Sequence, residues 1–126
     1  MPKHQFTCDA VPQYVPQQSD PEVGQYVFAY TITVRNTGEV AAQLVSRHWE
    51  IEDAQGQTQV VDGLGVVGQQ PLLQPGEAFR YTSSAALRTP MGIMSGHYFC
   101  VGVDGVRFEA PVPPFVLRAD GAGLVH

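Results

Sequence analysis

Apolar and polar residues alternate over long stretches of this chain. Between residues 26 and 34 every second residue is Tyr, Phe, Ile or Val, and the residues in between are mostly Ala and Thr. A second run, from Leu44 to Asp53, places Trp49 and Ile51 on one face and His48 on the other. A period of two with aromatic and β-branched residues predicts two β-strands, and the face of Trp49 and Ile51 is expected to be buried.

The remaining apolar runs are short and are separated by residues that favour turns. Asn36-Thr37-Gly38 and Asp104-Gly105 fit tight turns, and prolines exclude a long helix from the irregular stretch 63–76. A loop is expected at residues 89–92, and the first strand is expected to break near Pro12. Further strands are predicted at residues 6–15, 58–61, 79–85, 97–103 and 106–110, followed by a proline-restricted edge segment at 111–117.

About seven strands separated by turns predict an all-β domain. The fold class that fits is an immunoglobulin-like or fibronectin type III-like two-sheet antiparallel sandwich, with a small closed barrel as the alternative. The chain lacks the Cys…Trp…Cys framework of antibody domains, which favours the fibronectin-like variety. We expect residues 1–118 to form a single domain and residues 119–126 to form a flexible C-terminal tail.

Composition restricts the classes of partner. The 126 residues include 13 Gly and 10 Pro, and the formal net charge is -5 without a cluster of basic residues. Duplex nucleic acid is therefore not an expected ligand, and no apolar stretch is long enough to predict a membrane span. We expect a cytoplasmic protein in which Cys8 and Cys100 are free, buried thiols, although a disulfide between the two strands stays open as an alternative.

One glycine motif is a candidate binding site. Residues 63–68 read Gly-Leu-Gly-Val-Val-Gly and match G-x-G-x-x-G, in which glycines let backbone amides approach a phosphate. A dinucleotide site also needs a helix to begin within the motif, and Pro71 follows too soon. Two interpretations remain: a glycine-rich bend at a sandwich corner, or an anion-binding loop at Gly63, Gly65 and Gly68.

Arginines from elsewhere in the chain would have to supply the charge of such an anion site. The chain offers Arg47, Arg80 and Arg88 for this purpose, because no Lys follows the glycines at the spacing of a phosphate-binding loop.

Other chemistry-bearing residues give weaker patterns. His48, Glu50 and Glu52 project from one face of a strand, which predicts a solvated face, with metal binding as the alternative. The spacing of His4, Cys8, His97 and Cys100 does not indicate a zinc site. Ser83, Ser84 and Ser95 lie outside any nucleophile motif, so the sequence names no catalytic residue, no metal ligand and no cofactor.

The chain resembles the ApaG family from Val11 to Leu117. The resemblance rests on YVPQQSDP (14–21), FAYTITVRNTG (28–38), LVSRHWEIED (44–53), GLGVVGQQPLLQPGEAFRYTS (63–83), LRTPMGIMSGHYF (87–99) and PVPPFVL (111–117). Glu52 departs from the family pattern, where Thr is more usual, and the C-terminal tail is longer. The resemblance implies a fibronectin type III-like sandwich without an agreed catalytic residue.

The resemblance also implies a functional background. Bacterial members, also called CorD, are often encoded beside a diadenosine tetraphosphate hydrolase and are associated with cobalt and magnesium tolerance. Related domains occur in eukaryotic F-box proteins and in a DNA polymerase delta-interacting protein, as expected of an adaptor.

The sequence therefore predicts a non-enzymatic protein-interaction domain with an unidentified protein partner, present as a monomer or weak dimer. The alternative is a domain that binds phosphate or a nucleotide through Gly63–Gly68.

Overall fold

The computed structural model describes residues 2–119. Two short 3₁₀ helices, η1 (Pro16–Gln18) and η2 (Pro21–Val23), connect the first two strands. The strands, in chain order, are β1 (Phe6–Tyr14), β2 (Tyr26–Asn36), β3 (Ala42–Asp53), β4 (Thr58–Leu64), β5 (Leu72–Leu73), β6 (Ala78–Leu87), β7 (Met91–Gly102) and β8 (Arg107–Arg118).

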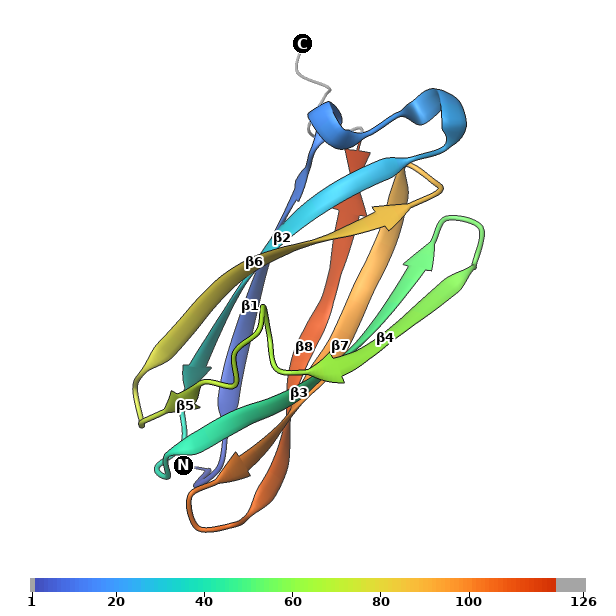
Figure 1. Ribbon diagram of the computed structural model, residues 1–126. Helices are drawn as coiled ribbons and strands as arrows, with labels where there is room; N and C mark the ends of the chain where they lie inside the picture. The colour runs from blue at the N-terminus through green and yellow to red at the C-terminus, as the bar shows by residue number, and fades with distance from the viewer. Residues whose placement is uncertain (1, 120–126) are drawn as a thin grey trace.

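The strands form two antiparallel sheets (Figure 1). One has three strands in the order β1-β2-β6, and the other has five, in which β4-β3-β7-β8 form the main path and β5 pairs with β3. No ladder joins the two sheets among the described residues, so the molecule is a sandwich rather than a closed barrel. The predicted two-sheet antiparallel sandwich is confirmed, and the two-residue β5 adds to the seven expected strands.

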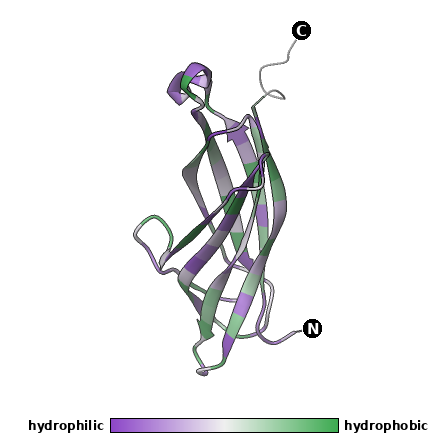
Figure 2. Ribbon diagram, turned by 90° about the vertical axis from the view of Figure 1, so that its right-hand side faces the viewer, coloured by the Kyte–Doolittle hydropathy of each residue, from purple (hydrophilic) through white to green (hydrophobic). Residues whose placement is uncertain are grey.

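The hydrophobic core lies between the sheets. Apolar and polar residues alternate along the strands, as the alternating green and purple bands of Figure 2 show. The face of β2 that carries Phe28, Tyr30, Ile32 and Val34 is buried. The predicted burial of Trp49 and Ile51 in β3 is confirmed, since they are 2% and 3% exposed. Other side chains in this core include Phe6, Phe28, Ile32, Val34, Leu44, Val66, Met94, Tyr98 and Leu117.

A β-bulge changes the alternation of β3. The register against β7 shifts between Leu44 and Ser46, so Val45 is the extra residue. Leu44 consequently points into the core and is fully buried, whereas simple alternation places it on the outer face with His48. After the bulge, Arg47 lies on the same inward face of β3 as Trp49 and Ile51.

Several elements are longer than the sequence pattern predicts. The break near Pro12 is wrong, because β1 is an edge strand and the missing N–H of proline costs it no ladder hydrogen bond. The strand β7 begins already at Met91, inside the expected loop, since Met91 pairs with Arg118 of β8.

The expected tail at 119–126 lies outside the described residues except for Ala119. The Ala119 amide donates to the carbonyl of Pro90.

Candidate functional site

The predicted glycine loop begins inside an edge strand. Gly63 belongs to β4 and pairs with Arg47 of β3, and the chain then leaves the sheet before it returns as β5 (Figure 1). Val66 fills the core from this loop and is fully buried. Strands β4 and β6 are edge strands of different sheets and do not pair, and we call the opening between them the open side of the sandwich. The loop closes part of this open side.

A tight turn ends the motif. Val66 and Gln69 exchange two backbone hydrogen bonds of 2.8 and 2.9 Å, which leaves Val67 and Gly68 as the two turn residues. Both have positive φ, 43° for Val67 and 81° for Gly68, as a type I′ turn requires. Gly65 also has a positive φ of 65°, and a Cβ there would lie 2.3 Å from the carbonyl oxygen of Gln69. The glycines at 65 and 68 thus allow the chain to turn.

Arg47 holds the loop from the side of the core. Its Nη1 donates to the carbonyl oxygens of Leu64 and Gly65, each at 2.9 Å. A Cβ on Gly63 would lie 2.7 Å from the Arg47 Cζ, so the absence of a side chain there makes room for the guanidinium. Every glycine of the motif consequently has a role in the geometry of the loop.

At the predicted anion site the loop presents backbone carbonyls, and the amide of Gly65 already donates a hydrogen bond within the protein. The carbonyls of Leu64 and Gly65 point at Arg47, and the amide of Gly65 donates to the carbonyl of Val45 at 2.8 Å. Anion binding at Gly63, Gly65 and Gly68 stays a prediction. Of the three arginines that the sequence offers for such a site, only Arg47 hydrogen-bonds the loop, since Arg80 bonds Thr33 on the outer face.

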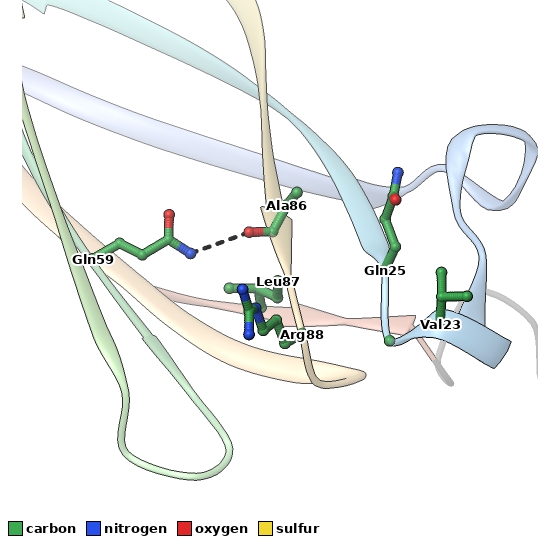
Figure 3. A pocket seen from close by; sticks show the side chains of 7 residues that line it. Val23, Gln25, Gln59, Ala86, Leu87 and Arg88 are labelled. Carbon is green, nitrogen blue, oxygen red and sulfur yellow. Dashed lines mark hydrogen bonds between the residues drawn. The ribbon is translucent and has the colours of Figure 1, made fainter.

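Arg88 lies at the far end of the open side, beside a cavity of about 470 Å³ (Figure 3). Val23, Gly24 and Gln25 line this cavity together with the end of β6. Gln59 of β4 reaches across the opening and donates to the carbonyl of Ala86 at 3.2 Å, so a single side chain bridges the two sheets here.

The outer face of the larger sheet holds a cluster of histidines and carboxylates. His48 Nδ1 lies 2.6 Å from Asp62 on β4, and its Nε2 lies 3.0 Å from Glu50. The ring stacks on His97 of β7 with 4.9 Å between centroids, and His97 lies 3.6 Å from Glu109 of β8. Hydrogen bonds that His48 donates to the carboxylates of Glu50 and Asp62 raise the pKa of His48.

The structure brings only part of the predicted His48, Glu50 and Glu52 row together. His48 and Glu50 form a pair, and both nitrogens of His48 already face carboxylates. Within residues 2–119, no group of three or more His, Cys, Asp or Glu side chains is arranged to hold a metal ion. Asp62 and Glu109, which the sequence pattern did not single out, come from neighbouring strands.

The two cysteines are free and buried, as the sequence predicted. Burial raises the pKa of each thiol to about 12, with a further contribution from Asp9 at Cys8 and from Cys8 at Cys100. His97 lies on the outer face, and His4 pairs with Asp104 at 2.8 Å. These four residues therefore do not meet in one site.

A cavity of about 290 Å³ adjoins the glycine loop on the open side of the sandwich. Arg47 enters it from β3, and the rings of Tyr30, Trp49 and Tyr81 form its inner walls. The sequence contains one signal for this site, because Arg47 occupies an inward position of β3 next to Trp49. A cation in such a position needs polar partners, and the loop carbonyls supply two of them.

Known proteins resemble the chain over nearly its whole length. The ApaG domain model matches residues 16–102. Protein ApaG of Ralstonia nicotianae is 60% identical, over 93% of this chain and 94% of that protein. Protein ApaG of Dechloromonas aromatica is 56% identical, over 95% of this chain and 94% of its own length.

A solved structure agrees with the fold as well. The crystal structure of the ApaA protein of Bordetella pertussis matches with a TM-score of 0.90 and 54% identity, covering 93% of this chain and 95% of that one. The domain model, the high identities and the shared fold lead to one conclusion: the chain belongs to the ApaG family.

Proposed function

We propose that this chain is a non-enzymatic, adaptor-type protein-interaction domain that adds a strand of its partner to the free edge of β4. The observation that carries this proposal is the composition of that edge. Val60 is 58% exposed and Leu64 is 75% exposed, and Val67 in the following turn is 53% exposed. An edge strand with free N–H and C=O groups and exposed apolar side chains is suited to pairing with another chain.

The other sheet edges carry features that discourage pairing. Pro12 lies in β1 and three prolines lie in β8, and these two strands also pack beside each other, with 5.4 Å between the rings of Phe6 and Phe108. The edge strand β6 carries an exposed basic residue, Arg80. β4 contains neither Pro nor a basic residue, and its one charged side chain, Asp62, is paired with His48. Proline and positive charge are devices that protect edges, so β4 is the least protected.

The chemistry of the described side chains supports a binding role. Both cysteine thiols have pKa values raised to about 12, so neither is a thiolate nucleophile near neutral pH. Tyr81 and Tyr98 bond to each other in the core, and burial raises the pKa of both phenols. The two thiols and the two phenols therefore belong to the packed core of the sandwich.

We place the domain in the cytoplasm, where a reducing environment keeps Cys8 and Cys100 as thiols. No helix among the described residues is long and apolar enough to cross a membrane. On this proposal, the links to cobalt and magnesium tolerance and to diadenosine tetraphosphate metabolism that the family resemblance implies depend on the bound partner.

The test is affinity capture from the native cell with three forms of the protein. The β4 variant carries Val60→Lys and Leu64→Lys, which introduce the charge that protects natural edge strands. The control carries Val103→Lys, since Val103 is 66% exposed in the hairpin between β7 and β8, away from β4.

We expect the wild type and the Val103→Lys control to recover the same partner and the β4 variant to lose it. Equal thermal unfolding of the three forms checks that the sandwich is intact. Recovery of the partner by the β4 variant at the wild-type level would contradict the proposed docking edge.

A further inference from the structure

The cavity beside the glycine loop has the features of a binding site. It has a volume of about 290 Å³ and is lined from both sheets, since Tyr30 and Tyr81 come from the smaller sheet and Arg47 and Trp49 from the larger one. Tyr30, Trp49 and Tyr81 are at most 6% exposed, so their rings form firm apolar walls. Ser83 of β6 and Val67 of the loop complete the opening.

The guanidinium of Arg47 is fixed in this cavity. Its Nη1 donates to two loop carbonyls, and Gly63 lies against it without a side chain. Among residues 2–119, Nε and Nη2 have no hydrogen-bond acceptor, so these N–H groups remain available. An immobilised guanidinium loses little conformational entropy when it binds a ligand, and two of its N–H groups match the two oxygens of a carboxylate or phosphate.

The charge of Arg47 has no carboxylate partner among residues 2–119. No Asp or Glu side chain in this range lies within 4.0 Å of the guanidinium. A cation next to buried aromatic rings, balanced only by two carbonyl dipoles, favours an anion close by.

We propose that this cavity binds a small organic anion. The carboxylate or phosphate group is held by Nε and Nη2 of Arg47, and the apolar part of the ligand packs against Trp49, Tyr30 and Tyr81. This site differs from the glycine-amide site that the sequence motif suggests, because the guanidinium supplies the donors and the glycines shape the loop that orients it. The inference goes beyond partner docking at β4 and does not depend on it.

Trp49 provides a direct readout, because it is the single tryptophan of the chain and lines the cavity. Its fluorescence is followed during titration with benzoate, phenyl phosphate and the neutral analogue benzamide. We expect saturable binding of at least one anion, and the tighter of the two identifies the acid group preferred. The affinity of benzamide is expected to be at least about tenfold lower than that of the anion, as the loss of a charged hydrogen bond predicts.

A pair of variants separates cavity binding from surface effects. Ser83→Phe places a ring in the cavity without changing Arg47, whereas Ser84→Phe places the same ring on the exposed, opposite face of β6. We expect Ser83→Phe to abolish anion binding and Ser84→Phe to retain it.

Arg47→Gln is a further variant, read by the same titration. It is expected to weaken binding about tenfold, and the Nε–H resonance of Arg47 in the wild-type protein is expected to shift as the anion is added. Anions that fail to saturate, benzamide that binds as tightly as benzoate, or Ser83→Phe that binds like the wild type would each overturn the proposal.

Discussion

Two polar side chains at inward positions donate hydrogen bonds to backbone carbonyls outside their own strands. Asn36 is 1% exposed, and its Nδ2 donates to the carbonyls of Val40 and Leu73. Arg47 likewise donates to the carbonyls of Leu64 and Gly65. A buried polar group without such partners would destabilise the fold by about 1–3 kcal/mol. The alternation along β3 indicates the inward position of Arg47, whereas the sequence pattern places Asn36 in a turn. It does not show which carbonyls either side chain reaches.

His48 is the residue whose titration tests the outer-face cluster. The hydrogen bonds that it donates to the carboxylates of Glu50, the larger effect, and of Asp62 raise its pKa above the usual 6.5. The stabilisation from protonated His48 is fully present below its unfolded pKa and is lost as the pH rises through its higher folded pKa. We expect proton NMR to show the elevated pKa, and Glu50→Gln and Asp62→Asn each to lower it.

Glu52→Gln is the matched control for His48, because Glu52 lies on the same face of β3 without a hydrogen bond to the ring. It is expected to leave the His48 titration unchanged. A His48 pKa that does not respond to Glu50→Gln or Asp62→Asn would show that the two carboxylates do not hold the ring in solution.

Alanine substitutions at Gly65 and Gly68 test whether the glycines of the motif are needed for the backbone conformation of the loop. Both have positive φ, so alanine at either position is strained by about 1–2 kcal/mol. Only at Gly65 would the new Cβ also collide with a backbone oxygen, that of Gln69. We therefore expect urea unfolding to show a larger loss of stability for Gly65→Ala than for Gly68→Ala. Equal losses would mean that the close approach to Gln69 relaxes at no cost.

Among the elements, β6 and β7 are joined across the core by two tyrosines. The hydroxyl groups of Tyr81 and Tyr98 lie 2.5 Å apart, and both side chains are buried. Either Tyr→Phe change leaves the other hydroxyl unpaired in the core and is expected to cost about 1–3 kcal/mol. We expect the double variant, measured by urea unfolding, to lose less stability than the sum of the two single variants. Strict additivity would indicate that the two hydroxyls do not interact.

The period-two pattern predicts most of the strands because each strand has one buried face. It identifies β2 and β3 well, and the Asp104-Gly105 turn between β7 and β8 is where expected. The pattern fails where register matters: nothing in residues 44–46 marks the bulge, which depends on the pairing with β7. The sequence indicates the site through the glycine motif and the inward position of Arg47, but not the contact between them, which arises from the pairing of Arg47 with Gly63.

The molecule as a whole is closed on one side and open on the other. Proline-containing β1 and β8 pack together on the closed side. On the open side, Arg47 and the glycine loop fill part of the gap, and Gln59 bridges to β6. The free edge of β4 also lies on this side (Figure 1). This asymmetry favours strand addition at β4 over the other edges.

Amide hydrogen exchange of the complex tests strand addition most directly. The partner recovered with the wild-type chain is mixed with it, and exchange is compared between the free and bound protein. We predict that amides of β4 (Thr58–Leu64) that do not bond to β3 become protected in the complex, because they then donate to the partner strand. Unchanged exchange across β4, with protection confined to β1 and β8, would contradict the account.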